Sequence, residues 1–233
     1  MLDTMRLFHK VLLCLLFVSF QSLNSRAQDV KETETYKHQK SVYQLASKYA
    51  DAGIAKNSLF NLIAMDPNDA SLLDSLAYMY YEYQQFTSCL LVCLDIIKKN
   101  PDHLTALEMS AVSYENLGLK DKALTSYESI YLRNSSIYTL YRIAILQLDL
   151  GRLGESMTNV NILLEKPEVK ETKISINTEQ GPSQISLEAG AYNLKGLIEN
   201  NQGDKEAARA SFEKAISIEP EFALAKSNLE DLN

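Results

Sequence analysis

The stretch "GDKEAARASFEKAISIEP", residues 203–220, begins with a glycine, ends with a proline and carries alanines at helical spacing between them. A stretch of the same design, "GLKDKALTSYESIYLRN", occupies residues 118–134. Glycine permits a tight turn and proline cannot continue a helix, so both patterns predict a turn followed by a helix. If a regular period relates the two stretches, the chain is a repeat protein, and its function lies in a surface rather than in a catalytic pocket.

Comparison of the chain with itself reveals such a period in the positions of small residues. The first series is Ala55, Cys89, Ala123, Ser156 and Ala208, with steps of 34, 34, 33 and 52. A larger apolar residue follows four positions later in each case, at Leu59, Cys93, Tyr127, Val160 and Phe212. The second series is Ala77, Ala111, Ala144 and Gly196, with steps of 34, 33 and 52. Because independent series share one set of steps, the sequence predicts repeated pairs of helices that approach closely at the small residues.

Turn and cap residues separate the predicted helices. The glycines between the two series are Gly118, Gly151 and Gly203. The prolines that close units are Pro67, Pro101 and Pro220. Asp69 and Asp102 each follow one of these prolines by one or two positions, and both are predicted to cap the next helix.

A 34-residue unit of two helices with these small and aromatic positions resembles the tetratricopeptide repeat (TPR) family. The resemblance covers about residues 36–222 and is strongest in residues 70–103, 104–136 and 189–222. Its departures from the family pattern are Ser135, Cys89, Ser156 and Lys195. The resemblance implies an all-α, right-handed TPR superhelix, a helix-turn-helix solenoid of about five units.

The step of 52 exceeds one repeat by 18 residues, so a segment is inserted between the fourth and fifth units. In "KISINTEQGPSQISL", residues 173–187, apolar and polar residues alternate on both sides of Gly181-Pro182. This alternation predicts a small two-stranded β-hairpin, and the alternative is a disordered loop. An isolated hairpin is only marginally stable, so this one must pack on the helices or on another molecule.

Residues 1–27 have the features of a secretory signal peptide. A basic start precedes the apolar run "VLLCLLFVSF" at residues 11–20, and the small residues Ser25 and Ala27 stand at a suitable cleavage site. A membrane-spanning helix needs about 20 apolar residues, so the alternative of a transmembrane anchor is disfavoured. We expect cleavage before Gln28 and export, with a periplasmic location in a Gram-negative bacterium, as in a secreted or periplasmic TPR protein.

The predicted domain organisation combines the leader, the repeats and the insertion. It comprises a signal peptide at residues 1–27, a linker at 28–35, TPR units one to four at 36–168, the inserted hairpin or loop at 169–188, and unit five with a capping helix at 189–233. The first unit is degenerate in its first helix, as expected of an end cap that is exposed on one side.

Composition and charge limit the classes of partner. The chain is 46% hydrophobic and carries a formal net charge of −7. Removal of residues 1–27 would take away three basic residues and one acidic residue, so the net charge would become −9. A phosphate backbone would be repelled by this charge, which excludes nucleic acid and favours a basic or apolar protein or peptide.

The two cysteines beyond the leader, Cys89 and Cys93, are predicted to be small apolar residues of a helix packing stripe. A disulfide between them is the first alternative, but a spacing of four on one helix is poor disulfide geometry. A metal site is the second alternative, and two thiolates without a nearby histidine make a weak one.

The sequence has no pattern that predicts catalysis. It has no glycine-rich phosphate loop, no nucleophile elbow and no histidine pair at metal spacing. The two histidines beyond the leader, His38 and His103, are expected at the surface. We therefore expect a protein that is not an enzyme and has no cofactor.

The family resemblance implies that the first helices of the units line a concave face on which TPR proteins bind partners. The residues predicted to point into this groove are Asp74, Tyr78, Tyr81, Glu82, Glu108, Asn116, Tyr138, Tyr141, Arg142, Asn193, Leu197 and Asn200. Tyrosine, asparagine and carboxylate side chains suit a peptide with apolar or basic residues. The alternative is that the tyrosines only fill gaps between helices.

The sequence thus predicts a scaffold that binds a protein or peptide through the concave TPR groove. Arg142 is the one strong cation among the predicted central groove residues, so a clamp for a terminal carboxylate, as in chaperone-binding TPR proteins, is not expected. The alternative function is a structural subunit of a larger cell-envelope assembly, which would use the solenoid edge or the inserted hairpin.

Overall fold

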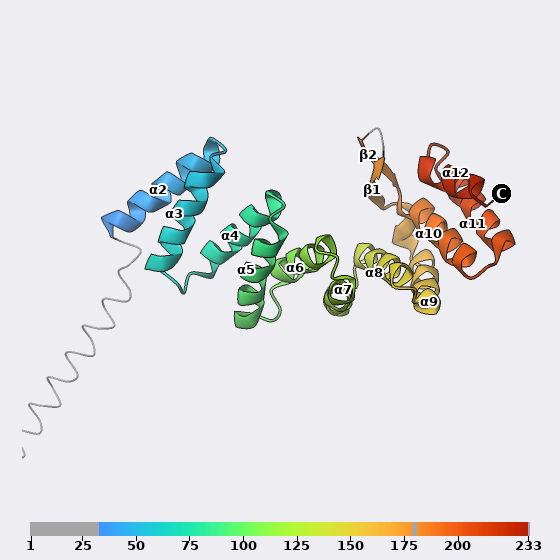
Figure 1. Ribbon diagram of the computed structural model, residues 1–233, viewed down its shortest axis with the longest axis horizontal. Helices are drawn as coiled ribbons and strands as arrows, with labels where there is room; N and C mark the ends of the chain where they lie inside the picture. Colours follow the sequence, from blue (N-terminus) through green and yellow to red (C-terminus); the bar gives the residue numbers. More distant parts are fainter. Residues whose placement is uncertain (1–32, 179–180, 233) are drawn as a thin grey trace, which may run out of the picture. The chain divides into compact units, whose positions relative to one another are not determined.

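The computed structural model describes residues 33–178 and 181–232, and most of these residues are in α-helices (Figure 1). The helices are α2 (Glu34–Lys48), α3 (Ala52–Met65), α4 (Ala70–Glu82), α5 (Phe86–Lys99), α6 (Leu104–Asn116), α7 (Lys120–Asn134), α8 (Ile137–Asp149), α9 (Leu153–Leu164), α10 (Leu187–Asn201), α11 (Lys205–Ile218) and α12 (Ala223–Glu230). A short 3-10 helix, η2 (Pro167–Lys170), precedes the strands β1 (Lys173–Thr178) and β2 (Gly181–Ser186). The predicted leader and residues 28–32 of the predicted linker lie outside the described residues.

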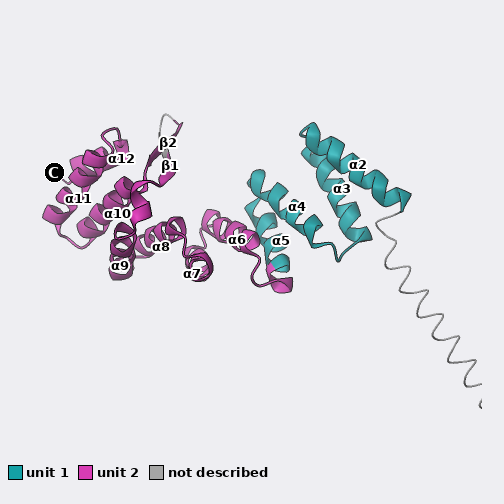
Figure 2. Ribbon diagram, turned by 180° about the vertical axis from the view of Figure 1, so that it is seen from behind, with its two compact units in different colours: residues 1–96 teal, residues 97–233 magenta. Residues whose placement is uncertain are grey.

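The chain forms two compact units, residues 1–96 and residues 97–233 (Figure 2). Unit 1 contains α2, α3, α4 and most of α5, and unit 2 contains α6 to α12 with the two strands. Within the units, α2 packs on α3, α6 on α7, α8 on α9 and α10 on α11. The predicted solenoid of helix pairs with an inserted hairpin is confirmed. The predicted domain boundaries after residues 168 and 188, which separate the first four repeats, the insertion and the fifth repeat, stay a prediction.

In the turn between the two helices of each pair, one residue has left-handed backbone geometry. These residues are Ala50 (φ 56°), Gln84 (φ 54°), Gly118 (φ 74°), Gly151 (φ 73°) and Gly203 (φ 87°). Their steps of 34, 34, 33 and 52 are the steps of the repeat. The sequence marks this turn only where the residue is glycine. Ala50 and Gln84 adopt the same conformation although a Cβ atom makes it less favourable.

The helix caps agree with the sequence in one of the two predicted places. Asp69 caps α4, because its Oδ1 accepts a hydrogen bond from the backbone N–H two residues later at 3.1 Å. The prediction for Asp102 is wrong. His103 caps α6 instead, with Nδ1 accepting from the N–H of Ala106 at 3.3 Å, because the helix begins one residue further along the chain. Asp102 forms an ion pair with Arg133 of α7 at 3.0 Å.

The small residues of both series are buried where the paired helices cross. The Oγ of Ser156 in α9 donates a hydrogen bond to the carbonyl of Ala144 in α8 at 2.7 Å, so only a hydroxyl separates the two backbones. At the crossing of α10 and α11, a Cβ on Gly196 would lie 2.5 Å from the ring of Phe212, so glycine is required there. The small residues therefore set the helix spacing, as the repeat pattern predicts.

The two cysteines are free thiols and fully buried, with 0% of each residue exposed. Their Sγ atoms lie 3.8 Å apart on α5. The hydrogen bond with Cys89, then burial and the charge of Asp74, raise the pKa of Cys93 far above its ordinary value. Both residues therefore act as small apolar packing residues, as predicted.

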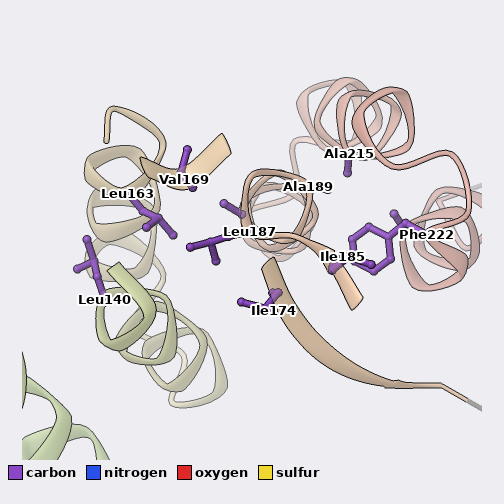
Figure 3. Packing of buried hydrophobic residues seen from close by; sticks show 11 residues of the cluster. Leu140, Leu163, Val169, Ile174, Ile185, Leu187, Ala189, Ala215 and Phe222 are labelled. Carbon is purple, nitrogen blue, oxygen red and sulfur yellow. The ribbon is translucent and has the colours of Figure 1, made fainter. Parts of the chain in front are cut away.

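The inserted segment forms an antiparallel hairpin that packs on the helices of unit 2. Ile174 of β1 pairs with Ile185 of β2, and both side chains are buried. Figure 3 shows Ile174 on the side of Leu187 and Ile185 next to Phe222, within one apolar cluster. This burial supplies the stability that an isolated hairpin lacks.

Candidate functional site

Unit 1 contains a pocket of about 390 Å³ between α2, the start of α3 and α4. Its larger lining side chains are Tyr43 of α2, Asp51 before α3, and Tyr78, Glu82 and Tyr83 in or next to α4. Alanine and serine side chains form the rest of the lining, with Met79. The pocket therefore lies between the first helices of two consecutive pairs and has aromatic and acidic walls.

Helical spacing places Tyr78 and Glu82 together on one side of this pocket. They are four residues apart on α4, and Tyr78 is 58% exposed. The charge of Glu82 raises the pKa of Tyr78, and a hydrogen bond between the two side chains raises it further. The phenol therefore stays neutral near neutral pH, with a carboxylate beside it.

The electrostatics of the pocket favour a cation. Asp51 and Glu82 are its two charged lining residues, and none of the lining residues, all of which the structure describes, is basic. One carboxylate oxygen of Asp51 accepts a hydrogen bond from the N–H of Ile54 at 3.0 Å and thereby caps α3. The C-terminal turns of α2 and α4 border the pocket and add partial negative charge, against one helix N-terminus from α3.

Of the four predicted groove residues in unit 1, Tyr78 and Glu82 line the pocket, and Asp74 and Tyr81 do not. Asp74 is half-buried, and its charge acts on Cys93 of α5. The ring of Tyr81 meets the ring of Phe86 edge to face, with centroids 6.5 Å apart. Tyr81 therefore belongs to the contact between α4 and α5, and Asp74 is near enough to α5 for its charge to act there.

Four of the predicted residues in unit 2 are exposed. They are Glu108 and Asn116 on α6, Tyr138 on α8 and Asn200 on α10. The side chain of Asn116 donates a hydrogen bond to the carbonyl of Val112 in its own helix at 2.9 Å. Tyr138 is 53% exposed and offers the largest apolar surface of the four.

Arg142 is half-buried and engaged in a polar cluster that the sequence did not predict. Its Nη2 pairs with Oε1 of Glu115 on α6, and Oε2 of the same carboxylate accepts a hydrogen bond from Tyr127 of α7 at 3.3 Å. Burial alone would lower the pKa of Arg142, but the hydrogen bond and charge of Glu115 outweigh it and the pKa rises. Burial, then the Glu115 charge, raises the pKa of Tyr127. The cation is therefore neutralised within the chain.

The remaining three predicted residues contribute to packing in unit 2. Tyr141 packs against the apolar cluster that contains Ile174, and burial raises its pKa to about 12. Asn193 is buried, and its Oδ1 accepts a hydrogen bond from Asn228 of α12 at 2.8 Å. Leu197 packs against the cluster of the last two helices.

The structure thus brings Tyr78 and Glu82 together in unit 1 and Tyr138, Tyr141 and Arg142 together on α8 of unit 2. A groove shared by the two sets stays a prediction. The sequence did not predict Tyr43, Asp51 and Tyr83 as pocket residues. Tyr43 lies in the first repeat, whose first helix departs from the repeat pattern, and Asp51 and Tyr83 flank helix ends.

In the part of the chain that the structure describes, no helix is both long and apolar enough to cross a membrane. Within residues 33–178 and 181–232, no group of three or more histidine, cysteine, aspartate or glutamate side chains is placed to hold a metal ion.

Comparison with protein families gives a match to the tetratricopeptide repeat for residues 189–222, which form the fifth helix pair. No curated protein matches the chain.

Several solved structures are similar in fold. A tetratricopeptide repeat protein from Parabacteroides merdae ATCC 43184 has 19% identity and a TM-score of 0.67, covering 86% of this chain and 73% of its own. YrrB, described as a TPR protein with an unusual peptide-binding site, has 14% identity and a TM-score of 0.65, covering 81% and 88%. MamA from Desulfovibrio magneticus RS-1 has 13% identity and a TM-score of 0.62, covering 82% and 98%. At these identities the likeness establishes the tetratricopeptide fold and no particular partner.

Proposed function

We propose that this protein is a non-enzymatic scaffold that binds an extended segment of a partner protein, with a basic side chain of that segment in the pocket of unit 1. The observation that carries the proposal is the composition of the pocket, which combines three tyrosine rings with two carboxylates and no basic residue among its lining. Stacking on an aromatic face and pairing with a carboxylate are two common ways in which proteins recognise a guanidinium or ammonium group.

The position of the pocket agrees with this role. It lies between α2 and α4, the first helices of two consecutive pairs, and these helices are expected to carry the partner-binding surface of a TPR protein. YrrB, which has a similar fold, is described as having an unusual peptide-binding site. Tyr78 supplies a large contact area at a small cost in side-chain entropy, because it has only two freely rotating bonds.

The test uses two labelled peptides and fluorescence anisotropy. One peptide carries a single arginine among valines and serines, and the other carries citrulline, a neutral isostere, in its place. We expect the arginine peptide to bind more tightly and to lose affinity as salt increases. Tyr78→Ala should weaken its binding by about 30-fold, since truncation of an aromatic anchor costs about 2 kcal/mol. Glu82→Gln should remove most of the difference between the two peptides.

Tyr49→Ala is the matched control in the same unit. Tyr49 is 70% exposed, follows α2 as its C-cap residue and is not among the pocket-lining residues. Its truncation should leave both affinities within about twofold, as for a residue outside the contact. Equal binding of the two peptides, or equal losses from Tyr78→Ala and Tyr49→Ala, would refute the proposed pocket.

We further propose that the protein acts outside the cytoplasm. The support is the sequence of residues 1–27, with its basic start, apolar run and cleavage site before Gln28. Mass spectrometry of the protein isolated from its cells should give a mature chain that begins at or near Gln28. An intact N-terminus at Met1 would contradict export by this route.

A further inference from the structure

The hydrogen-bond pattern of the hairpin determines which backbone groups face outward. Leu187 donates its N–H to the carbonyl of Thr172 at 2.8 Å, and Ser186 donates its N–H to Oε2 of Glu219 at 3.3 Å rather than to β1. In an antiparallel pair, bonded and non-bonded residue pairs alternate. The pair Lys173–Ser186 is therefore non-bonded, and its backbone groups point away from the partner strand.

The same alternation continues along the hairpin. The non-bonded pairs after Lys173–Ser186 are Ser175–Gln184 and Asn177–Pro182. Pro182 has no N–H to donate, which agrees with its place in a non-bonded pair. The backbone groups that point outward are consequently those of Lys173, Ser175 and Asn177 on β1, and those of Pro182, Gln184 and Ser186 on β2.

The two edges differ in what they offer another strand. On β2, Pro182 lacks a donor and the N–H of Ser186 is already bonded to Glu219, which follows α11. Only Gln184 retains an outward N–H there. On β1, among the described residues, the outward amides of Lys173 and Ser175 have no hydrogen bond outside the hairpin, and both side chains are exposed. An edge with successive donors and acceptors is a template for another strand, whereas proline and a side-chain bond protect the opposite edge.

The open edge lies on the side of α8. A Cβ on Gly190 of α10 would meet both Cδ1 of Ile174, at 2.9 Å, and the hydroxyl of Tyr141 on α8, at 3.0 Å, so Ile174 reaches the space between these helices. Ile185 faces Phe222 on the other side (Figure 3). Tyr138 precedes Tyr141 by about one turn of α8, and its ring is 53% exposed.

A strand added at this edge would lie over a surface of the preceding repeat that is equivalent to the surface that β1 covers. Gly190 and Tyr138 are 52 residues apart, which is the step between the fourth and fifth units. β1 covers α10 at Gly190, so a strand added beside β1 would lie toward the equivalent position of the preceding unit, where Tyr138 is exposed. The hairpin thus already holds one extended segment against a first helix, and the next segment would continue the same sheet.

We propose that the outer edge of β1 binds an extended segment of a partner protein by strand addition, with the segment's apolar side chains toward Ile176 and Tyr138 and a carboxylate facing Lys173. The backbone groups of Lys173, Ser175 and Asn177 provide the main-chain hydrogen bonds. Lys173 lies on the opposite face of β1 from Ile174 and Ile176, because successive side chains alternate. An acidic residue opposite Lys173 supplies a favourable cross-strand charge pair. This site is independent of the unit 1 pocket.

The test uses a probe that satisfies this pattern in either strand direction, acetyl-Glu-Val-Thr-Val-Thr-Val-Glu-amide with a fluorescent label. Ser175→Pro removes the central outward N–H of β1 and places a ring on that edge. Gln184→Pro makes the identical change directly opposite, on β2. Both positions belong to a non-bonded pair, so neither proline removes a hydrogen bond between the strands.

We expect Ser175→Pro to weaken probe binding at least about tenfold, because main-chain hydrogen bonds to the edge are lost. Gln184→Pro should change it by less than about twofold, since no bond to the probe is lost. Hydrogen exchange of single amides in the unaltered chain tests the same edge without any substitution. Probe binding should slow the exchange of the Ser175 amide and leave that of Gln184 unchanged. Tyr78→Ala should not affect this probe, which separates the result from that of the pocket.

Several outcomes would overturn the proposal. These are no binding of the probe to the unaltered chain, equal losses from the two prolines, or protection of Gln184 instead of Ser175. Light scattering tests whether the edge instead binds a second copy of this chain, by measuring the oligomeric state of the free protein. A dimer of the free protein that Ser175→Pro dissociates would mean that the edge binds a second copy of this chain and not a partner segment.

Discussion

The contact between Gly196 of α10 and Phe212 of α11 allows a quantitative test of what the repeat encodes. Replacing Gly196 by alanine would place a Cβ 2.5 Å and 2.6 Å from two ring carbons of Phe212, far inside van der Waals contact. The ring cannot move away easily, because Phe212 is fully buried and packs with Ala208 and Leu232. Either α10 and α11 must separate or the ring must leave its rotamer.

The size of the effect follows from two opposing contributions. Overpacking of a core costs about 1–3 kcal/mol, and so short a contact with an enclosed ring belongs at the upper end. Alanine in place of glycine in a helix interior returns about 1 kcal/mol. Gly196→Ala should therefore lower the free energy of unfolding by about 2 kcal/mol. Gly154→Ala in α9 is the matched control, because no heavy atom lies within 4 Å of its added Cβ, and it should leave stability unchanged or slightly higher.

A second substitution should rescue the first. The preceding unit has Ala144 and Val160 at the positions of Gly196 and Phe212, and both are fully buried. Phe212→Val in the Gly196→Ala chain reproduces that pair. Phe212→Val alone leaves a cavity, so the double variant should be more stable than the sum of the two single changes by about 1 kcal/mol or more.

Urea unfolding followed by far-UV circular dichroism measures these free energies, and hydrogen exchange localises the loss to α10 and α11. Localisation matters because the units of a repeat array unfold with some independence. A Gly196→Ala chain as stable as the Gly154→Ala chain would refute the reasoning. So would strict additivity of the two changes, because the small and large positions would then not be coupled through direct contact.

Three further changes test the buried polar and thiol groups. Arg142→Ala should lower the free energy of unfolding by about 1–3 kcal/mol, because Glu115 loses its ion-pair partner. Glu115→Ala should then lower the free energy of unfolding by less in the Arg142→Ala chain than in the unaltered chain. Cys89→Ala with Cys93→Ala should cost less than about 3 kcal/mol, the loss typical of a removed disulfide, and the native thiols should resist alkylation until the chain unfolds. Burial raises the pKa of Tyr141 from 10.0 to about 12, so the neutral phenol favours the folded state. That stabilisation is complete below pH 10 and is lost as the pH rises from 10 toward 12, a decline that should be smaller in Tyr141→Phe when unfolding is measured across this range.

The fold could be predicted because packing is periodic, and a period is visible in one sequence. Cys89 and its counterparts are buried in all five repeats, and Ala77 and its counterparts are buried in four, so several repeats report one packing requirement. The hairpin could be predicted from its alternation around Gly181. The turns at Ala50 and Gln84 could not be recognised, because the left-handed conformation is imposed there by the surrounding helices and not by glycine.

The candidate sites were harder to predict because surface chemistry does not repeat. Helical spacing placed Arg142 correctly on α8, but its partner Glu115 is on another helix, 27 residues away. Asn193 likewise meets Asn228 of the last helix. A single sequence shows which side of a helix a residue occupies, whereas the availability of that residue depends on polar contacts from elements far along the chain.

The inserted hairpin packs where one repeat position has lost its side chain. Gly190 stands where the preceding unit has Tyr138, and its missing side chain leaves room for both Ile174 and the hydroxyl of Tyr141. A larger residue at Gly190 would displace the hairpin, and removal of the hairpin would uncover Tyr141. The glycine, the half-buried tyrosine and the strand therefore require one another. In the fifth unit the chain thus fills its own first-helix surface with an extended segment, and the blocked edge at Pro182 and Glu219 leaves β1 as the direction in which this sheet can grow.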